Sequence, residues 1–199
     1  MARPRDPRRR VELLDAIIGH LATHGVAGLS LRPLAKALGQ STSVLTHHFA
    51  TKDELITAVL TRLDQRQRDR LQALPGWEEG RSLGAVIRAS WDWHLSGDNL
   101  PLIRLLHEIE GLAAAGRLTG PYVPTMLSDR AEFVAEALRA HGVSDEDARA
   151  NATLLNAAYA GLQLDYLTTG DTKRVETALD RLVKLADAWT DPRSDHAPS

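Results

Sequence analysis

The chain has 199 residues, of which 43% are hydrophobic and 25% charged, and its formal net charge is -2 at pH 7. It contains no cysteine, which excludes a disulfide framework and any thiolate metal site, and it has no long apolar run of the kind that spans a membrane. The first ten residues, MARPRDPRRR, lack the apolar segment of a secretory signal. We therefore expect a cytoplasmic protein with no membrane partner.

The charges are unevenly distributed along the chain. Residues 1–50 hold seven Lys or Arg against three acids, a balance of +4, and the remainder carries -6. A basic first quarter on an acidic body is typical of a small nucleic-acid-binding head joined to a domain with another role. The alternative interpretation is a solvated basic tail confined to Arg3–Arg10.

The apolar spacing predicts helices throughout the chain, without the alternation of a strand. Thr51 with Glu54 and Ser144 with Asp147 resemble capping boxes. Gly170 is expected to end one helix, with Asp171 or Thr172 capping the next. Pro75-Gly76 is expected to break the chain between helices. Helices are expected over residues 8–24, 31–38, 42–49, 51–74, 82–96, 101–115, 122–141, 145–169 and 172–189.

The stretch GVAGLSLRPLAKALGQSTSVLTHHFATKDEL, residues 25–55, contains two short helices joined by a tight turn. The first has apolar residues at the i, i+3, i+4, i+7 spacing of one buried helix face. Gly39 then permits a left-handed turn at no steric cost. Ser41, Thr42 or Ser43 can cap the second helix. This arrangement predicts a helix-turn-helix, whose second helix can enter the major groove of DNA. Its expected core residues are Leu34, Leu38, Leu45 and Phe49.

The polar residues around this turn suit contact with DNA. Short hydroxyl side chains near the start of a recognition helix approach base edges closely, and a histidine can donate or accept according to its tautomer. Helix N-termini offer free N–H groups to phosphate. Ser30 and Ser41 can instead serve only as caps. The candidate DNA-binding residues are Ser30, Arg32, Lys36, Ser41, Thr42, Ser43, Thr46, His47 and Lys52.

These residues together resemble the TetR family of bacterial transcriptional repressors. The matching pattern is Gly25, LSLRPLAKALG, S-x-S-V-L-x-x-H-F and x-x-K-x-x-L, and it covers roughly residues 8–60. The C-terminal stretch YAGLQLDYLTTGDTKRVETALDRLV also looks like the family's last two helices. One departure is Thr46, where family members commonly carry a tyrosine that touches a DNA phosphate.

The resemblance implies an all-helical homodimer that is a ligand-responsive repressor. Each subunit would present one helix-turn-helix to half of a palindromic operator on double-stranded DNA, and a small-molecule inducer would release it. We expect a DNA-binding domain over residues 1–52 with a basic N-terminal arm, a ligand-binding and dimerisation domain over 53–190, and a disordered tail over 191–199. The alternative is a dimeric small-molecule-binding protein of the same fold whose DNA binding is weak or lost.

The ligand pocket is expected among neutral residues of the C-terminal helices, because such pockets are mostly apolar with a few orienting polar groups. Asn156 and Gln163 are amides on an otherwise apolar helix, and can line a pocket or hydrogen-bond across a dimer. The aromatic candidates can instead be ordinary core. The set favours a moderately hydrophobic ligand of unknown identity. The candidates are Trp91, His94, His107, Tyr122, Met126, Asn156, Tyr159 and Gln163.

The last two helices are the expected dimer interface. Their apolar faces are wider than one partner helix covers, and two helices from each subunit make a four-helix bundle. The alternative is that these faces pack only within one chain. The candidate interface residues are Leu155, Ala158, Leu162, Tyr166, Leu179, Leu182, Val183 and Ala186.

An enzyme is the rival class. His20 and His24 lie four residues apart and are a possible metal pair, but the HExxH pattern and a third ligand are absent. Catalytic serine, phosphate-loop and dinucleotide-binding motifs are also missing from the sequence. We therefore expect no catalysis, no metal and no cofactor.

Overall fold

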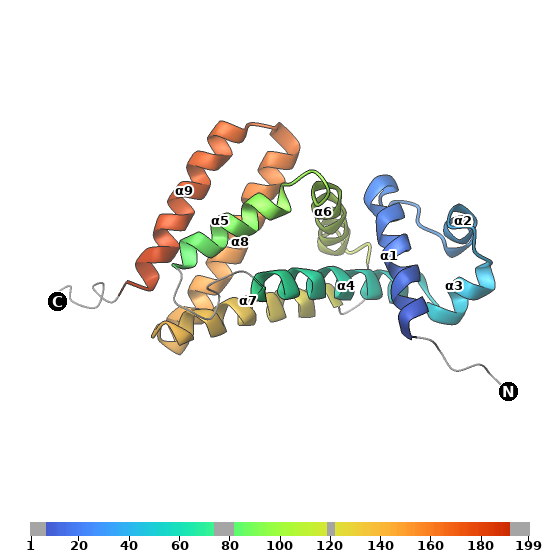
Figure 1. Ribbon diagram of the computed structural model, residues 1–199, viewed down its shortest axis with the longest axis horizontal. Helices are drawn as coiled ribbons and strands as arrows, with labels where there is room; N and C mark the ends of the chain where they lie inside the picture. Colours follow the sequence, from blue (N-terminus) through green and yellow to red (C-terminus); the bar gives the residue numbers. More distant parts are fainter. Residues whose placement is uncertain (1–6, 74–81, 119–121, 192–199) are drawn as a thin grey trace. The chain divides into compact units, whose positions relative to one another are not determined.

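The computed structural model describes residues 7–73, 82–118 and 122–191, and in these ranges it contains nine α-helices and no strand (Figure 1). The prediction of an all-α fold is confirmed. None of the described helices combines the length and hydropathy needed to cross a bilayer. Pro75-Gly76 and residues 192–199 of the predicted tail lie outside the described residues. The helices are α1 (Pro7–His24), α2 (Leu31–Ala37), α3 (Thr42–His48), α4 (Lys52–Gln72), α5 (Leu83–His94), α6 (Leu100–Ala114), α7 (Tyr122–Ala140), α8 (Asp145–Thr169) and α9 (Thr172–Trp189).

The chain divides into two compact units. The first comprises residues 1–68 and 94–124, and the second comprises residues 69–93 and 125–199. The first unit therefore contains α6 as well as α1, α2, α3 and most of α4. The domain boundary expected after residue 52 stays a prediction.

The core of the first unit forms where the apolar faces of its helices meet. An ion-pair cluster joins two of these helices. Asp15 on α1 accepts hydrogen bonds from Arg62 Nε at 2.9 Å and lies 2.7 Å from Arg66 Nη2, both on α4. The hydrogen bond from Arg62 is the main cause that lowers the pKa of the Asp15 carboxyl below its ordinary value. The buried residues of α1 to α4 in this core are Leu14, Ile17, Ile18, Leu21, Leu34, Ala35, Leu45, Leu55, Ile56, Val59 and Leu60.

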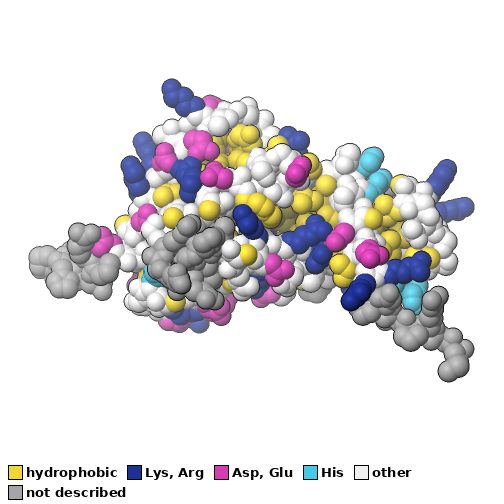
Figure 2. All heavy atoms as spheres, viewed as in Figure 1, with side chains coloured by type: hydrophobic (Ala, Val, Ile, Leu, Met, Phe, Trp, Pro, Cys, Tyr) yellow, Lys and Arg dark blue, Asp and Glu magenta, His cyan; other side chains and the backbone are white. Residues whose placement is uncertain are grey.

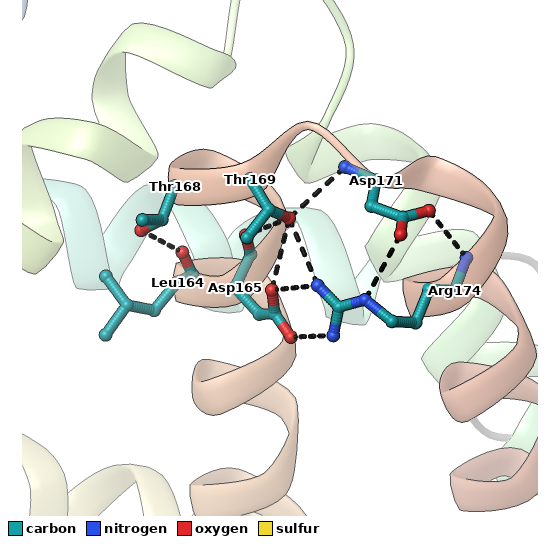
Figure 3. A network of polar contacts seen from close by, with 6 residues as sticks. All are labelled: Leu164, Asp165, Thr168, Thr169, Asp171 and Arg174. Carbon is teal, nitrogen blue, oxygen red and sulfur yellow. Dashed lines mark hydrogen bonds and ion pairs between the residues drawn. The ribbon is translucent and has the colours of Figure 1, made fainter.

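The second unit is built around the hairpin of α8 and α9, which a polar network closes at the turn (Figure 3). Arg174 near the start of α9 donates two hydrogen bonds, each 2.6 Å long, to the carboxylate of Asp165 on α8. Its Nε donates to Asp171 at 3.2 Å, and Asp171 caps α9 by accepting from the Arg174 N–H. Gly170 has a φ of +68° and ends α8. The turn is therefore fixed by both backbone conformation and charge pairing.

Helix α5 packs closely on α9 at its N-terminal end. The Gly84 N–H donates to Asp187 Oδ1 at 2.7 Å. A Cβ added at Gly84 would lie 2.5 Å from Asp187 Oδ2 and 2.6 Å from Val183 Cγ1, so this approach requires glycine. Further along α5, Arg88 pairs with Glu176 and Asp180 of α9, and Trp91 Nε1 donates to Glu176 at 3.0 Å.

Candidate nucleic-acid interface

The turn between α2 and α3 has the hydrogen bonding of a Schellman motif. Gly39 has a φ of +63°, and its N–H donates to the carbonyl oxygen of Lys36 at 3.2 Å. The N–H of Gln40 donates to the carbonyl oxygen of Ala35 at 2.8 Å. These are the two bonds that close a helix end with a left-handed glycine. The turn is thus held by main-chain groups, as expected from Gly39.

Apolar contacts beneath the turn hold α2 and α3 together. Leu34, Leu45 and Phe49 are at most 2% exposed, as expected for the core. Leu38, also expected in the core, is only half-buried. The physical reason is its position as the C-cap of α2, where the chain leaves the buried helix face and begins the turn. The Arg10 guanidinium of α1 lies 5.4 Å from the centre of the Phe49 ring, a cation–π contact that covers the end of α3.

Helix α3 presents its predicted contact residues to solvent. Ser41 is the N-cap, and its hydroxyl accepts from the Val44 N–H at 3.3 Å and is 2.8 Å from the Ser43 hydroxyl. Thr42 and His47 are exposed. Since Leu45 is buried on the opposite side, the helix has one face for the core and one face of short polar groups. This is the arrangement that a recognition helix needs.

Thr46 uses its hydroxyl within its own helix. The hydroxyl donates to the carbonyl oxygen of Thr42 at 3.0 Å and to that of Ser43 at 3.3 Å. A hydroxyl carries a single proton, so this proton is shared between two backbone acceptors in the described conformation. Thr46 as a whole remains exposed to solvent.

The other predicted contact residues flank α3. Ser30 is the N-cap of α2, in extended backbone, and makes no side-chain capping bond. Arg32 and Lys36 are exposed on α2, whereas Lys52, the first residue of α4, is half-buried. Figure 2 shows Lys and Arg side chains, in dark blue, projecting from the surface around α1–α3. Arg8, Arg9 and Arg10 are exposed at the start of α1, and residues 1–6 of the predicted arm lie outside the described residues.

The start of α4 carries a modified capping box. The Glu54 N–H donates to Thr51 Oγ1 at 3.1 Å, as the motif predicts. The Glu54 carboxylate accepts from the N–H of Ala50 at 2.7 Å, one residue earlier than the N-cap. The side chain thus ties the end of α3 to the start of α4.

Comparison with known proteins agrees with this geometry. Residues 13–59 match the family described as bacterial regulatory proteins, tetR family. The structure of the multidrug binding protein EbrR complexed with imidazole is 30% identical, with a TM-score of 0.69, and the match covers 93% of both chains. The chain belongs to the TetR family.

Two further relatives are similar to this TetR-family chain. A member of the family from Streptomyces coelicolor A3 is 28% identical with a TM-score of 0.69, and the match covers 90% of this chain and 98% of that one. The HTH-type transcriptional regulator BetI of Klebsiella pneumoniae (strain 342) is 29% identical over 90 residues, covering 43% of this chain and 46% of BetI. The chain therefore aligns with about half the length of this curated relative.

Five of the predicted ligand residues lie in the second unit, and two of them, Trp91 and Tyr159, contact each other. Trp91 is buried and meets Tyr159 edge to face, with ring centres 5.5 Å apart, and the Tyr159 hydroxyl donates to Ser90 Oγ at 3.2 Å. Burial raises the pKa of this hydroxyl well above its ordinary value. Asn156 and Gln163, also on α8, each have a buried amide nitrogen with no hydrogen-bond partner among the described residues. Met126 is buried, and its sulfur accepts from Arg130 at 3.7 Å.

The remaining predicted ligand residues belong to the first unit. His94 is 2% exposed, and Tyr122 is half-buried. His107 Nδ1 is 3.4 Å from Glu110 Oε2, and its Nε2 is buried with no hydrogen-bond partner in the described part of the chain. All eight assignments to ligand binding stay predictions.

The predicted dimer residues divide by burial. Leu155, Leu179, Leu182 and Ala186 are buried within the single chain, so they pack in the second unit itself. Ala158, Leu162, Tyr166 and Val183 are half-buried. The exposed large apolar side chains of α8 and α9 are Leu154, Leu164 and Leu185. None of these three leucines is among the eight candidate interface residues. The role of these helices in a dimer stays a prediction.

The possible metal pair on α1, His20 and His24, consists of two rings in contact with each other. The rings of His20 and His24 stack with centres 4.1 Å apart, and His24 Nδ1 lies 2.9 Å from the carbonyl oxygen of His20. Across the described residues there is no group of three potential metal ligands.

Proposed function

We propose that this chain is a ligand-responsive, DNA-binding transcriptional regulator, and specifically a repressor that a small-molecule inducer releases from its operator. The observation that carries the proposal is the α2–α3 pair, in which exposed hydroxyl and imidazole groups project from a buried apolar base. The family match over residues 13–59 supports it. The relatives named above include a transcriptional regulator, and we assign no catalytic function or cofactor.

In this proposal α3 enters the major groove. Thr42 and His47 contact base edges, while Ser30, Arg32, Lys36 and Lys52 bind phosphates on either side. Base contacts then determine the sequence preference, and phosphate contacts determine the affinity and its dependence on salt. Ser41 keeps its capping role and Ser43 lies beside it.

We further propose that the chain acts as a homodimer in the cytoplasm. Two heads related by a twofold axis fit a palindromic operator whose half-sites are about one helical turn apart. The exposed Leu154, Leu164 and Leu185 give α8 and α9 apolar surface for a second copy. Replacing Leu154 and Leu185 together by Glu should convert the dimer to a monomer in sedimentation analysis. Replacement of exposed Leu127 on α7 by Glu is the matched control and should leave the dimer intact.

The proposed inducer is a moderately hydrophobic small molecule. EbrR, which is 30% identical, has been solved with ethidium and with imidazole. The Trp91–Tyr159 pair and the unpartnered amides of Asn156 and Gln163 support an aromatic or planar ligand with hydrogen-bond acceptors. Ethidium is a suitable first probe, titrated into the protein without DNA because ethidium itself intercalates. Saturable binding that Trp91→Ala weakens supports the pocket, and unchanged binding in that variant contradicts it.

The decisive experiment is binding of the purified protein to duplexes from the region upstream of its gene, with random DNA as competitor, at several salt concentrations. Tight, competitor-resistant binding to a palindrome is expected. Thr42→Ala and His47→Ala should change the preferred sequence, whereas Lys184→Ala, at an exposed position of α9, should not. Uniformly weak binding on all sequences would contradict the proposal.

The second candidate is a small-molecule-binding protein of the same fold that no longer reads DNA. The observation that favours it is Thr46, whose hydroxyl bonds to its own helix in place of the phosphate-binding tyrosine common in the family. Saturable ligand binding together with uniformly weak DNA binding would support this second candidate.

A further inference from the structure

Glu108 on α6 reaches the turn between α1 and α2. Its Oε1 accepts hydrogen bonds from the backbone N–H groups of Val26 and Ala27, both at 2.9 Å. These partners lie more than 80 residues away in the sequence but belong to the same compact unit. The predicted DNA contacts and predicted ligand residues do not include Glu108.

The turn is shaped to receive this carboxylate. Gly25 has a φ of +74°, and a Cβ placed there would lie 2.8 Å from Glu108 Oε2 and 3.1 Å from Oε1. Two successive N–H groups that converge on one oxygen form a small anion-binding concavity. Val26 is fully buried, so its N–H needs an acceptor from within the protein. A left-handed glycine, two donors and one carboxylate therefore fit together as one contact.

This contact lies at the entrance to the helix-turn-helix. The Leu29 N–H donates to the carbonyl oxygen of Val26 at 3.1 Å, and Ser30 then caps α2. The path of residues 25–30 thus determines where α2 begins, and the Gly39 turn determines where α3 follows. A shift of the first turn is carried into the recognition helix because the three-helix core is close-packed.

We propose that Glu108 is a positioning residue through which α6 holds the helix-turn-helix. The carboxylate fixes the α1–α2 turn, and the turn fixes α2 and α3. Because a hydrogen bond of 2.9 Å is lost beyond about 3.5 Å, a displacement of α6 by about 1 Å removes both bonds and frees the turn. The consequence for DNA binding rests on the proposed function, whereas the contact itself does not.

The first test measures amide hydrogen exchange on the free, full-length protein. Glu108→Ala should speed exchange at Val26 and Ala27 by roughly 10- to 100-fold, with a smaller acceleration through α2 and α3. Glu108→Gln keeps one neutral acceptor, so it should accelerate exchange at the same amides by a smaller factor. This variant provides the measurement if Glu108→Ala folds poorly. Glu110→Gln, on another face of α6, is the matched control and should leave these amides unchanged. Exchange unchanged in both Glu108 variants would overturn the proposal.

The second test measures operator affinity against salt concentration. Glu108→Gln should weaken binding by about 3- to 10-fold without altering the salt slope, because the number of phosphate contacts is unchanged. Faster exchange at the turn with wild-type affinity would overturn the link between the turn and the recognition helix. If the wild-type protein binds no DNA, the proposed function fails, and exchange through α2 and α3 alone decides whether Glu108 positions them.

A double-mutant cycle tests whether Glu108 occupies the space beside Gly25. Gly25→Ala combines strain at positive φ with a clash against Glu108. In the Glu108→Ala background only the strain remains, so Gly25→Ala should there raise the unfolded fraction less than in the wild type. Equal effects in both backgrounds would show that Glu108 does not occupy the space beside Gly25, and would overturn the proposal.

Discussion

Thr46 donates its hydroxyl proton to the carbonyl oxygen of Thr42, one helical turn earlier in α3, at 3.0 Å. At this position the TetR family commonly presents a tyrosine hydroxyl to a DNA phosphate. In the proposed function, a threonine side chain that bonds back to its own helix leaves that phosphate to other donors. We therefore expect the affinity for DNA to depend more on α2 and on the start of α4.

Substitutions at Thr46 test whether its hydroxyl contributes to DNA binding. Thr46→Val keeps the shape and removes the hydroxyl, and we expect operator affinity to stay within about twofold because that hydroxyl proton is used inside the helix. Thr46→Tyr adds a longer donor and should raise affinity by roughly 2- to 10-fold, the range of one hydrogen bond. Fluorescence anisotropy with a labelled operator measures both. A large loss in the valine variant would show that the threonine hydroxyl turns toward DNA on binding.

A substitution at Lys52 tests the electrostatic contribution to DNA affinity. Lys52→Ala should weaken binding to specific and random DNA alike and reduce the slope of log K against log salt by about 1, because one phosphate contact is lost. Lys184→Ala removes an exposed lysine from α9 and is the control. An unchanged slope in Lys52→Ala would remove this residue from the interface.

The helices were largely predictable because their ends are chemically marked. The bounds expected for α8 and α9 match the structure, since Ser144 and Asp171 accept the N–H groups of Asp147 and Arg174 and Gly170 adopts the left-handed conformation. The end of α5 was expected at Ser96, just before Gly97, but lies at His94, and Gly97 lacks the positive φ that Gly170 adopts at the end of α8. A glycine in the sequence marks a helix end reliably only where the chain adopts the left-handed conformation there.

The long-range contacts were not predictable from the sequence. The periodicity correctly indicated that Leu34, Leu45 and Phe49 are buried. It carried no sign that Glu108 contacts Val26, because a half-buried glutamate on an apolar helix resembles any solvent-facing charge. The apolar pattern also could not distinguish Leu179, which packs within the chain, from Leu185, which is exposed. Such distinctions require the three-dimensional arrangement of the helices.

The Asp15 cluster predicts a pH-dependent contribution to stability. The folded pKa of Asp15 is lowered from the ordinary value of 3.8, so its stabilisation is present above that value and is lost as pH falls through the folded pKa. Asp15→Asn should reduce the free energy of unfolding at pH 7 by about 1 kcal/mol, a modest figure because these side chains are partly exposed. Urea denaturation should show the difference from wild type shrinking below pH 4. The control is Glu12→Gln, which removes an exposed carboxylate from the same helix and should have little effect. A difference that persists undiminished at pH 2 would contradict the assignment.

The close approach of α9 to Gly84 predicts that a larger side chain at this position destabilises the second unit. Gly84→Ala places a methyl group against Asp187 and Val183, and should lower the free energy of unfolding by about 1–3 kcal/mol. Gly19→Ala, at an exposed position of α1, meets no atom within 4 Å and should raise the free energy of unfolding by up to about 1 kcal/mol through helix propensity. Thermal denaturation of the two variants makes the comparison. Equal melting temperatures would show that α5 does not approach α9 as closely as described.

The Schellman turn at Gly39 has a consequence for how operator preference can change. Its bonds come from the main chain of Gly39 and Gln40, and its support comes from the buried Leu34, Leu45 and Phe49. Thr42 and His47 take no part in either. The residues that would read bases can therefore be exchanged without dismantling the scaffold that carries them, so a library randomised at these two positions should yield folded proteins with new target sequences.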